Sequence, residues 1–248
     1  MHPSLEPLRK KELNKMVDAK IIFPVRHTRW VANLVLVRKK NGDMRLCIDF
    51  RNLNKASQKH NYLVSSMEHI LQRISRSEML SLLDGFSRYN EVLVSNGDQL
   101  KTTFNTKWST YAYCKIPFGL INAGTTFQRA MDIAFQGLIN RSVVVYMDDI
   151  TMYSYHRRDH IYHLRQIFER CRRYGISLNP RKTIFVVIEG KLLGHILSKE
   201  AIVIDPERVE TIMRIQNPAN KRAMQYFFGK INSVRKFVPG FTEIVHPM

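Results

Sequence analysis

Cysteine is scarce in this sequence. The 248 residues include three cysteines, Cys47, Cys114 and Cys171, which lie far apart and form no Cys-x-x-Cys pair. An odd, scattered set of this kind argues against a disulfide framework, completes no zinc site, and is typical of a reducing compartment. We therefore expect buried or idle thiols and a cytoplasmic protein.

Long apolar runs are also missing. No run approaches the roughly 20 residues that a membrane-spanning helix needs, and the first residues lack the charged-then-apolar pattern of a signal peptide. Low-complexity tracts and repeats of solenoid length are absent as well. Hydrophobic residues still make up 44% of the chain and aromatic residues 10%, which is typical of a folded globular protein.

Acidic residues are few. The chain has 21 Asp and Glu against 39 Lys and Arg, which gives a net charge of +18 and a pI near 10.0. So basic a chain is expected to bind a polyanion, either nucleic acid or an anionic membrane surface. Because no spanning segment is predicted, nucleic acid is the favoured partner and we expect no membrane association.

Residues 31–50 carry the clearest hairpin pattern. Two strand-like runs, 31–40 and 44–50, flank Asn41-Gly42, a strong two-residue turn signal. With Asn41 and Gly42 at the tip, alternation predicts one buried and one cationic face. The buried face would carry Val35, Val37, Met44, Leu46 and Ile48. The cationic face would carry Arg38, Lys40 and Arg45, and composition alone leaves open whether it is only solvated or lies over phosphates.

Three aspartates follow apolar, strand-like runs. Residues 79–84 are predicted to form a buried strand that ends at Asp84, and the β-rich runs 143–146 and 150–153 flank Met147-Asp148-Asp149. Adjacent carboxylates in an apolar hairpin repel each other unless a cation lies between them, and magnesium suits an all-oxygen site. Asp84 would add a third carboxylate if the strands are neighbours. Asp-Asp is also common in ordinary turns, so the pair alone leaves both interpretations open.

Helical patterns occupy much of the remaining sequence. Helices are predicted over 4–19, 125–138, 157–174, 205–215 and 220–237, and a second hairpin over 89–94 and 101–104. This order predicts an α+β fold with a helical C-terminal part. Within 157–174, one buried face would carry Ile161, Leu164, Ile167, Phe168 and Cys171. His156, His160 and His163 are expected on a solvated helix face, because they complete no tetrahedral ligand spacing.

Several motifs in a fixed order go beyond these patterns. The sequence resembles, over nearly its whole length, the reverse transcriptase domain of gypsy-class long-terminal-repeat retrotransposons, a fragment of a Pol polyprotein. The motifs that carry the resemblance are Leu46-Cys47-Ile48-Asp49-Phe50-Arg51-Asn52-Leu53-Asn54-Lys55, Pro117-Phe118-Gly119-Leu120 with Asn122-Ala123, Phe127-Gln128-Arg129, Tyr146-Met147-Asp148-Asp149-Ile150, Leu178-Asn179-Pro180-Arg181-Lys182, Leu193-Gly194-His195, Asp205-Pro206-Glu207-Arg208-Val209 and Phe237-Val238-Pro239-Gly240-Phe241.

The resemblance implies a right-hand polymerase, with fingers and palm over residues 1–200 and a mostly helical thumb plus the start of a connection region over 201–248. It implies RNA-directed DNA polymerase activity, which adds deoxynucleotides from deoxynucleoside triphosphates to a primer on an RNA or DNA template. Two Mg²⁺ ions are expected, with Mn²⁺ as a substitute. No protease, ribonuclease H or integrase is expected here, and a full element would place the chain in a retrotransposon particle.

The resemblance also implies residue roles. Asp84, Asp148 and Asp149 would be the catalytic, metal-binding carboxylates of the palm. Lys40 and Arg45 would bind the triphosphate of the incoming nucleotide, Tyr89 would exclude a 2′-hydroxyl, and Gln128 would contact the nucleotide. Gly194 and His195 would belong to the primer grip. Taken alone, Tyr89, Gln128 and His195 have a plainer interpretation as packed or solvated side chains.

The sequence also departs from the family pattern. Arg88, Asn90 and Glu91 surround Tyr89 where the family usually has Gly, His or Asn, and Gln. Gly124 stands where proline is favoured, and Tyr62-Leu63-Val64-Ser65 replaces Tyr-Pro-Leu-Pro. These departures leave open a catalytically impaired relic that only binds nucleic acid, in a salt-dependent and sequence-independent way. An RNA-dependent RNA polymerase is a third alternative, against which Tyr89 and the Tyr-Met before the aspartates argue.

Overall fold

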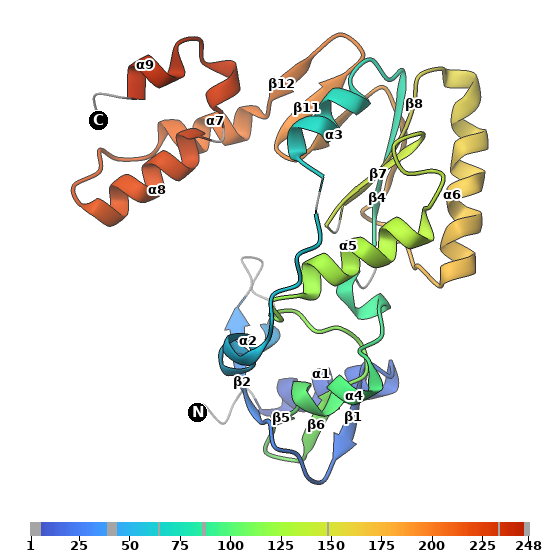
Figure 1. Cartoon of the computed structure of the whole chain (residues 1–248), viewed down its shortest axis with the longest axis vertical. Helices are drawn as coiled ribbons and strands as arrows, with labels where there is room; N and C mark the ends of the chain where they lie inside the picture. The colour runs from blue at the N-terminus through green and yellow to red at the C-terminus, as the bar shows by residue number, and fades with distance from the viewer. Residues whose placement is uncertain are drawn as a thin grey trace. The chain divides into compact units, whose positions relative to one another are not determined.

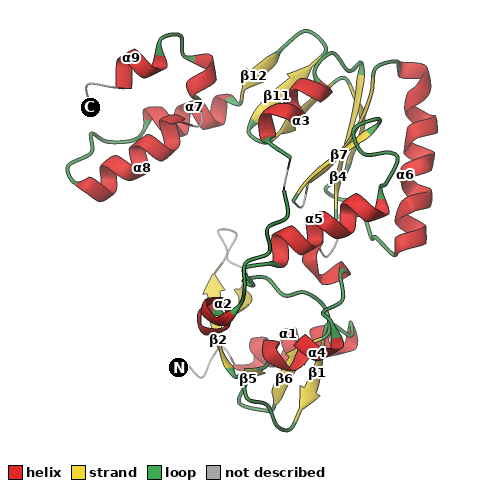
Figure 2. Ribbon diagram, in the orientation of Figure 1, coloured by secondary structure: helices red, strands yellow, loops and turns green. Residues whose placement is uncertain are grey.

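The computed structural model describes residues 6–38, 44–63, 65–85, 88–147, 149–232 and 234–245 (Figures 1 and 2). The chain forms two compact units. The first comprises residues 1–65, 82–152 and 161–184, and the second comprises residues 66–81, 153–160 and 185–248. Neither unit begins or ends at residue 200, so the boundary between palm and thumb expected there stays a prediction. None of the helices in the described ranges is long and apolar enough to cross a membrane.

A five-stranded sheet lies in the first unit (Figure 2). Its strand order is β1 (Ile22–Val25), β6 (Thr110–Tyr113), β5 (Phe104–Asn105), β2 (Ala32–Arg38) and β3 (Met44–Ile48). The β2–β5 pair is parallel, and the other neighbours are antiparallel. Leu13 of α1 (Glu6–Asp18) packs into the core of this sheet, which confirms the N-terminal helix. The short helix α2 (Arg51–Ala56) follows β3.

The β2–β3 hairpin is confirmed, but its predicted register is wrong by one residue. Val35 pairs with Cys47 and Val37 pairs with Arg45, whereas an Asn41-Gly42 tip would pair Val35 with Ile48. Val35 and Val37 are therefore 44% and 46% exposed instead of buried. Among the side chains of these two strands that the structure describes, Ala32, Leu34, Leu46 and Ile48 pack in the core.

Loop length explains this shift. The paired strands end at Arg38 and Met44, so the connection spans residues 39–43, which lie outside the described residues. Its number of residues is odd, whereas the predicted turn has two. A slip of one residue moves a whole strand's side chains to the opposite face.

A four-stranded sheet carries the acidic strand ends. Its order is β7 (Val143–Tyr146), β8 (Asp149–Ser154), β4 (Met79–Asp84) and β9 (Ile184–Val187), which confirms the strands predicted before and after the aspartates. The helices α5 (Ala123–Ala134) and α6 (His160–Tyr174) pack against β7 and β8 (Figure 1). The buried core of this packing includes Leu83, Phe127, Met131, Phe135, Val143, Val145, Ile150, Met152, Leu164 and Ile167.

The helix predicted over 157–174 holds with changes. The helix α6 begins at His160, after the 3₁₀ turn η4 (Arg157–Asp159), and Ile161 is 60% exposed although it was expected in the buried face. Periodicity predicts which face of a helix is apolar, but not how far along the helix the core reaches. The predicted stop is confirmed: Gly175 has a φ of 67°, and Ile176 N donates to Cys171 O at 2.9 Å.

The second predicted hairpin is wrong. Residues 88–102 form η2 (Arg88–Glu91), α4 (Asn96–Gln99) and η3 (Leu100–Thr102) instead of strands. Residues 92–94 bond to the segment after β6 instead of to 101–104, since Ile116 N donates to Val92 O and Val94 N donates to Cys114 O, both at 2.9 Å. Phe104 pairs instead with Tyr111 in the β5–β6 hairpin.

The second unit contains α3 (Met67–Ile74), a three-stranded antiparallel sheet and the C-terminal helices. The sheet order is β10 (Glu189–Leu192), β11 (His195–Ser198) and β12 (Ile202–Ile204). The helices that follow are α7 (Pro206–Met213), α8 (Lys221–Asn232), the 3₁₀ turn η5 (Arg235–Phe237) and α9 (Phe241–Val245). The predicted helix starts are confirmed, because Asp205 Oδ1 accepts from Glu207 N and Asn220 Oδ1 accepts from Ala223 N.

Candidate functional site

Asp84 and Asp149 lie at the ends of neighbouring strands. Asp84 is the last residue of β4, and Asp149 is the first residue of the adjacent strand β8. Tyr146 pairs with Asp149, so a two-residue connection joins β7 to β8. Met147, the first residue of this connection, has a φ of 53°, in the left-handed region. Asp148, the second residue, lies outside the described residues.

A hydrogen bond at the other end of these strands indicates their relative direction. Glu78 N donates to Ser154 O at 3.0 Å. Asp84 is six residues after Glu78, and residue 148 is six residues before Ser154. We infer that β4 and β8 run antiparallel and that Asp84 lies level with the turn between β7 and β8. The fold therefore brings Asp84 and Asp149 to the same end of one sheet.

The segment after α6 lines the end of β4. Lys182 Nζ lies 3.4 Å from Asp84 Oδ2. Asn179 N donates to Asp84 O at 2.7 Å, and Asp84 N donates to Thr183 Oγ1 at 3.3 Å. Lys182 ends the family-like motif Leu178–Lys182, and the sequence predicted no role for it. Its only sequence signal was its place as one of two cations, with Arg181, in a motif otherwise built from Leu, Asn and Pro.

The carboxylates of Asp84 and Asp149, at the ends of these neighbouring strands, suit a hard divalent cation, which prefers oxygen ligands. The side chain of Lys182 is 63% exposed and that of Asp84 is 18% exposed. An ion pair with so exposed a partner is weak, so a divalent ion could replace the ammonium group at little cost. Among the residues that the structure describes, which do not include Asp148, no group of three or more His, Cys, Asp and Glu side chains could hold a metal.

Gln128 lies inside the molecule, behind the turn. Its side chain is 3% exposed, and its amide group is used within the chain. Gln128 Nε2 donates to Val145 O at 3.1 Å and to Asp132 Oδ1 at 3.1 Å, while its Oε1 accepts from Met147 N at 2.9 Å. A direct contact with a nucleotide would need the side chain to leave these bonds.

Tyr89 is half-buried between two aromatic rings. Its ring centroid lies 4.9 Å from that of Phe118 and 5.4 Å from that of Phe127, both in edge-to-face geometry. Such contacts hold an aromatic ring in one orientation. Gly124 belongs to the first turn of α5, and a Cβ added there would lie 3.8 Å from Tyr89 Oη, an ordinary contact distance.

The two cations predicted to bind the triphosphate are only partly described. Lys40 lies outside the described residues. Arg45 lies in β3, where its backbone pairs with Val37 and not with Arg38 as the predicted register required. Their phosphate contacts therefore stay predictions.

Gly194 and His195 lie at the tight turn between β10 and β11. Leu192 pairs with His195, and the two turn residues, Leu193 and Gly194, both have positive φ, at 51° and 77°. Two positive φ values are typical of a type I′ turn, whose backbone twist matches that of the two flanking strands. Arg208 Nη1 donates to Leu193 O at 3.2 Å, and a Cβ at Gly194 would collide with that guanidinium group. Glycine therefore suits the backbone at this position, and any other residue would displace the guanidinium group of Arg208.

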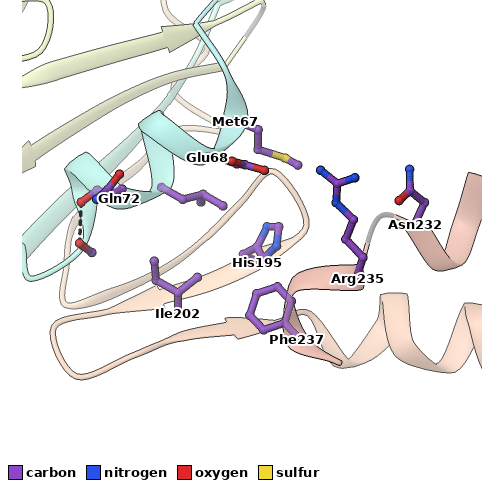
Figure 3. A pocket seen from close by; sticks show the side chains of 10 residues that line it. Met67, Glu68, Gln72, His195, Ile202, Asn232, Arg235 and Phe237 are labelled. Carbon is purple, nitrogen blue, oxygen red and sulfur yellow. Dashed lines mark hydrogen bonds between the residues drawn. The ribbon is translucent and has the colours of Figure 1, made fainter. Parts of the chain in front are cut away.

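His195 is buried, and its ring faces a cavity of about 600 Å³ (Figure 3). His195 Nδ1 lies 3.0 Å from Leu193 O, and its ring centroid lies 5.4 Å from that of Phe237 in η5. Glu68 of α3 and Ile202 of β12 line the same cavity (Figure 3). His195 therefore belongs to the packed base of the β10–β11 turn and is not an ordinary loop histidine.

Comparison with known proteins identifies the family. The family model described as "Reverse transcriptase (RNA-dependent DNA polymerase)" matches residues 37–197, which include Asp84 and Asp149. The chain belongs to the reverse transcriptase family.

Curated relatives of this reverse transcriptase chain are polyproteins of transposons. It is 31% identical over 208 residues to the retrovirus-related Pol polyprotein from transposon gypsy of Drosophila melanogaster, which covers 84% of the chain and 20% of the relative. It is 30% identical over 204 residues to the corresponding polyprotein from transposon 297 of the same organism, with 82% and 19% covered. The chain thus spans about a fifth of the length of these relatives.

Solved structures of a foamy viral protease-reverse transcriptase share the fold. One, in complex with double-stranded DNA, has a TM-score of 0.89 and 20% identity, and covers 99% of the chain and 43% of that protein. Another, in complex with an RNA/DNA hybrid, has a TM-score of 0.84 and 19% identity, with 100% and 33% covered. The expected α+β polymerase fold is confirmed.

Glu91, one of the departures from the family pattern, stabilises a junction between two segments. Glu91 Oε1 accepts a hydrogen bond from Ser177 N at 3.1 Å, just beyond the end of α6. Its carboxylate therefore supports the junction between α6 and the Leu178–Lys182 segment. The side chain of Arg88 lies outside the described part of the structure.

The solvated face expected for the histidines of α6 is wrong for His160. His160 is 1% exposed; its Nε2 lies 2.9 Å from Ser81 Oγ and its Nδ1 lies 3.1 Å from Ser154 Oγ. Ser81 Oγ also accepts from Val186 N at 3.1 Å. The histidine thus links α6 to strands β4, β8 and β9, which a helical periodicity of polar residues could not predict.

Two C-terminal helices line a basic pocket. A cavity of about 450 Å³ lies between α7 and α8, lined by Arg208 and Thr211 on one helix and by Gln225, Tyr226 and Lys230 on the other. Lys230 Nζ lies 5.5 Å from the centroid of the Tyr226 ring. None of the described residues that line this pocket is acidic. The pocket therefore offers cations and hydrogen-bond donors to an anion.

Proposed function

We propose that this chain is an RNA-directed DNA polymerase. It adds deoxynucleotides, supplied as deoxynucleoside triphosphates, to the 3′-end of a primer on an RNA or DNA template. The observation that carries the proposal is the reverse transcriptase match over residues 37–197, which encloses two aspartates at the ends of neighbouring strands. The net charge of +18 supports a polyanionic substrate.

Asp84, Asp148 and Asp149 are proposed as the catalytic carboxylates and metal ligands. The chemistry supplied by bound magnesium, or by Mn²⁺ in its place, is activation of the primer 3′-hydroxyl and stabilisation of the leaving pyrophosphate by two ions. The chain's own contribution is to hold carboxylate oxygens at one end of the four-stranded sheet. Lys182, which is exposed and lies 3.4 Å from Asp84, holds a positive charge beside that carboxylate, a charge that a bound divalent ion would supply in its place.

The incoming nucleotide is proposed to bind between the β2–β3 hairpin and the aspartates. Lys40 and Arg45 would neutralise triphosphate charge, because Arg and Lys form charge-assisted hydrogen bonds with phosphate oxygens. Tyr89 would exclude a 2′-hydroxyl sterically. Its contacts with Phe118 and Phe127 support this role, since a ring that is held in place can reject an added atom.

The template–primer duplex is proposed to contact the second unit. Gly194 and His195 would form the primer grip, at a turn that Arg208 braces. Arg208 and Lys230 line a pocket without acidic residues in its described lining, which suits a backbone phosphate. Because such contacts release counterions, binding is expected to weaken steeply as salt is raised.

Primer extension on an RNA template with magnesium tests this function. The parent chain is expected to extend the primer, and Asp148→Asn is expected to abolish extension because it removes one carboxylate charge and a metal-ligating oxygen. Asp159→Asn is the matched control, because Asp159 is an exposed aspartate of η4 whose carboxylate lies 3.7 Å from Arg158 Nε. That variant is expected to extend at the parent rate.

Two further measurements separate the alternatives. Salt-dependent duplex binding by a parent chain that extends no primer would favour a relic that only binds nucleic acid. Incorporation of ribonucleotides as readily as deoxynucleotides by the parent would favour an RNA polymerase. Under the proposed function, replacing Tyr89 by valine should raise ribonucleotide incorporation and leave deoxynucleotide incorporation nearly unchanged.

A further inference from the structure

The turn before Asp148 is connected to the surface by a chain of hydrogen bonds that the proposed polymerase roles do not include. Gln128 and Asp132 are four residues apart in α5, so both side chains lie on one face of the helix. Gln128 binds the turn through Val145 O and Met147 N and reaches Asp132 Oδ1 with the same amide group. Its NH₂ group faces two acceptors and its oxygen faces a donor, so each polar atom has a partner of the right kind.

The second oxygen of Asp132 extends the chain of bonds to Tyr62. Tyr62 Oη donates to Asp132 Oδ2 at 2.6 Å, a distance typical of a hydrogen bond to a charged acceptor. This hydrogen bond, together with partial burial, raises the pKa of Tyr62. At neutral pH Tyr62 therefore keeps the proton that it donates.

The backbone around Tyr62 is itself tied to the start of α5. Asn122 Oδ1 accepts from His60 N at 2.9 Å, and Asn122 Nδ2 donates to Gln58 O at 2.8 Å. The rings of His60 and Tyr62 are stacked, with their centroids 6.1 Å apart. One side chain at each end of α5 thus holds the 58–62 segment, and the same helix holds the turn.

The turn needs such support. Met147 has a φ of 53°, a conformation that costs energy in any residue with a Cβ, and its side chain is 40% exposed, so packing contributes little. A strained backbone persists only where its surroundings determine it. The hydrogen bond from Met147 N to Gln128 Oε1 is a contact that does so directly.

We propose that Tyr62 and Asp132, acting through Gln128, are positioning residues that hold the Met147–Asp149 turn in its working conformation. The inference rests on the proposed polymerase function of that turn. It changes the role expected for Gln128, which acts on the backbone of the turn instead of on the nucleotide. It also assigns a role to Tyr62, which begins the segment that lacks the two prolines of the family pattern.

Hydrogen exchange of the Met147 amide, measured in protein labelled with ¹⁵N-methionine, tests the network without any need for activity. Gln128→Glu puts a second carboxylate against Asp132 and Val145 O. Because these acceptors repel one another, the side chain at position 128 should be displaced from the turn, and we expect exchange at Met147 to become about tenfold faster, the value of one lost hydrogen bond. Tyr62→Phe removes only the last bond of the network and should have a smaller effect in the same direction.

A complementary second substitution distinguishes hydrogen bonding from loss of packing. In the double variant Gln128→Glu/Asp132→Asn, the amide introduced at position 132 donates to the carboxylate introduced at position 128, and the amide oxygen accepts from Tyr62. The bonds between positions 128 and 132 and between position 132 and Tyr62 are thus restored with reversed polarity, while Val145 O loses its donor. Exchange at Met147 should therefore be slower than in Gln128→Glu and return part of the way to the parent rate. The matched control for Gln128→Glu is Gln166→Glu, because Gln166 is exposed on α6 and its amide bonds to the hydroxyl of Tyr162.

Steady-state kinetics provide the functional readout. If the network positions the turn, Gln128→Glu should lower kcat about tenfold with little change in the nucleotide KM, and the double variant should recover part of kcat. A rise in KM with unchanged kcat would support a direct nucleotide contact and overturn the proposal. Unchanged exchange and unchanged kcat in Gln128→Glu and Tyr62→Phe would overturn it as well.

These measurements also separate the network from the proposed function. If the parent extends no primer but Met147 exchange follows the expected order, the positioning network stands and the polymerase proposal fails. If the parent extends primers but exchange at Met147 is the same in all variants, the polymerase proposal stands and the network fails. Thermal unfolding of each variant shows whether a loss of kcat comes from loss of the fold.

Discussion

The two hairpins of the first unit, β2–β3 and β7–β8, were predicted from the same kind of sequence pattern with different success. In β7–β8 the two predicted strands pair, although no register was predicted and Asp149 belongs to β8 instead of the predicted tip; Val143, Met152 and Tyr153 are fully buried. In β2–β3 the register is shifted by one residue, which leaves Val35 and Val37 exposed. The two hairpins therefore differ in how strongly their surroundings determine the register.

Burial explains this difference. A shift of one residue in β7–β8 would move buried side chains out of a core shared with α5 and α6 and would break the bonds to Gln128. In β2, apolar residues occupy both faces, since Leu34 packs into the core while Val35 does not. Hydrophobicity alone cannot choose between these two faces, so the length of the connection decides the register.

The largest expected difference between the hairpins is in stability. Val143→Ala in β7 should lower the free energy of unfolding by roughly 2–3 kcal/mol, because it removes two buried methyl groups and leaves a cavity. Val37→Ala in β2 is the matched substitution at an exposed position, and its cost should stay below about 0.5 kcal/mol. Urea unfolding of both variants measures the two values. Equal costs would contradict the burial explanation.

The cysteines report the same contrast through their reactivity. Cys171 packs in the core beside β7 and β8, where burial raises the pKa of its thiol to about 12. Because only the thiolate is alkylated, native Cys171 should react with iodoacetamide at pH 8 at least ~100-fold more slowly than Cys47 of β3. Peptide mass spectrometry measures both rates in one sample.

Unfolding provides the control for this experiment. In urea the two thiols should be labelled at similar rates, because neither is then buried. A native Cys171 that reacts as fast as Cys47 would show that α6 opens readily from the sheet, and the contrast between the hairpins would lose its basis.

A cross-strand disulfide tests the register of β2–β3 directly. Val35 pairs with Cys47, and facing residues of an antiparallel pair are close enough for a disulfide. Val35→Cys should therefore oxidise with Cys47, about tenfold faster than Leu36→Cys, which pairs with Leu46. Gel mobility under non-reducing conditions follows both reactions. Faster oxidation of Leu36→Cys would instead support the register that an Asn41-Gly42 turn predicts, in which residue 36 faces Cys47.

The smallest expected effect is the pH dependence of Asp49, which follows β3. Hydrogen bonds from Arg51 lower the pKa of Asp49 from 3.8 to about 2. A carboxyl group whose pKa is lower in the folded state stabilises the fold above its unfolded pKa and loses that contribution as the pH falls. The contribution of Asp49 should therefore disappear between pH 3.8 and about 2.

Urea midpoints at pH 6 and pH 3 measure this change. The parent should lose more stability than Asp49→Asn over this interval, because the asparagine cannot titrate. Asp98→Asn is the control, since Asp98 forms an exposed ion pair with Lys101 in the same unit. An equal loss in the parent and in Asp49→Asn would exclude this carboxylate from the acid response.

Much of the architecture follows from local sequence. The strand that ends at Asp84, the strands around Asp148 and the glycine stop after α6 were predicted because short apolar runs and left-handed glycines have few alternative structures. The starts of α7 and α8 were predicted because Asp205 and Asn220 are capping residues. The order of motifs predicted the polymerase fold, which the comparisons confirm.

The tertiary structure alone decided which polar groups meet. Gln128 reaches the turn from another element, Tyr62 reaches Asp132 from 70 residues away, and Lys182 reaches Asp84 from beyond α6. His160 is buried against two serines of neighbouring strands, although its helix position suggested a solvated face. Periodicity describes one element and its own faces. A hydrogen bond between elements depends on how they pack, and that information lies in no single segment of the sequence.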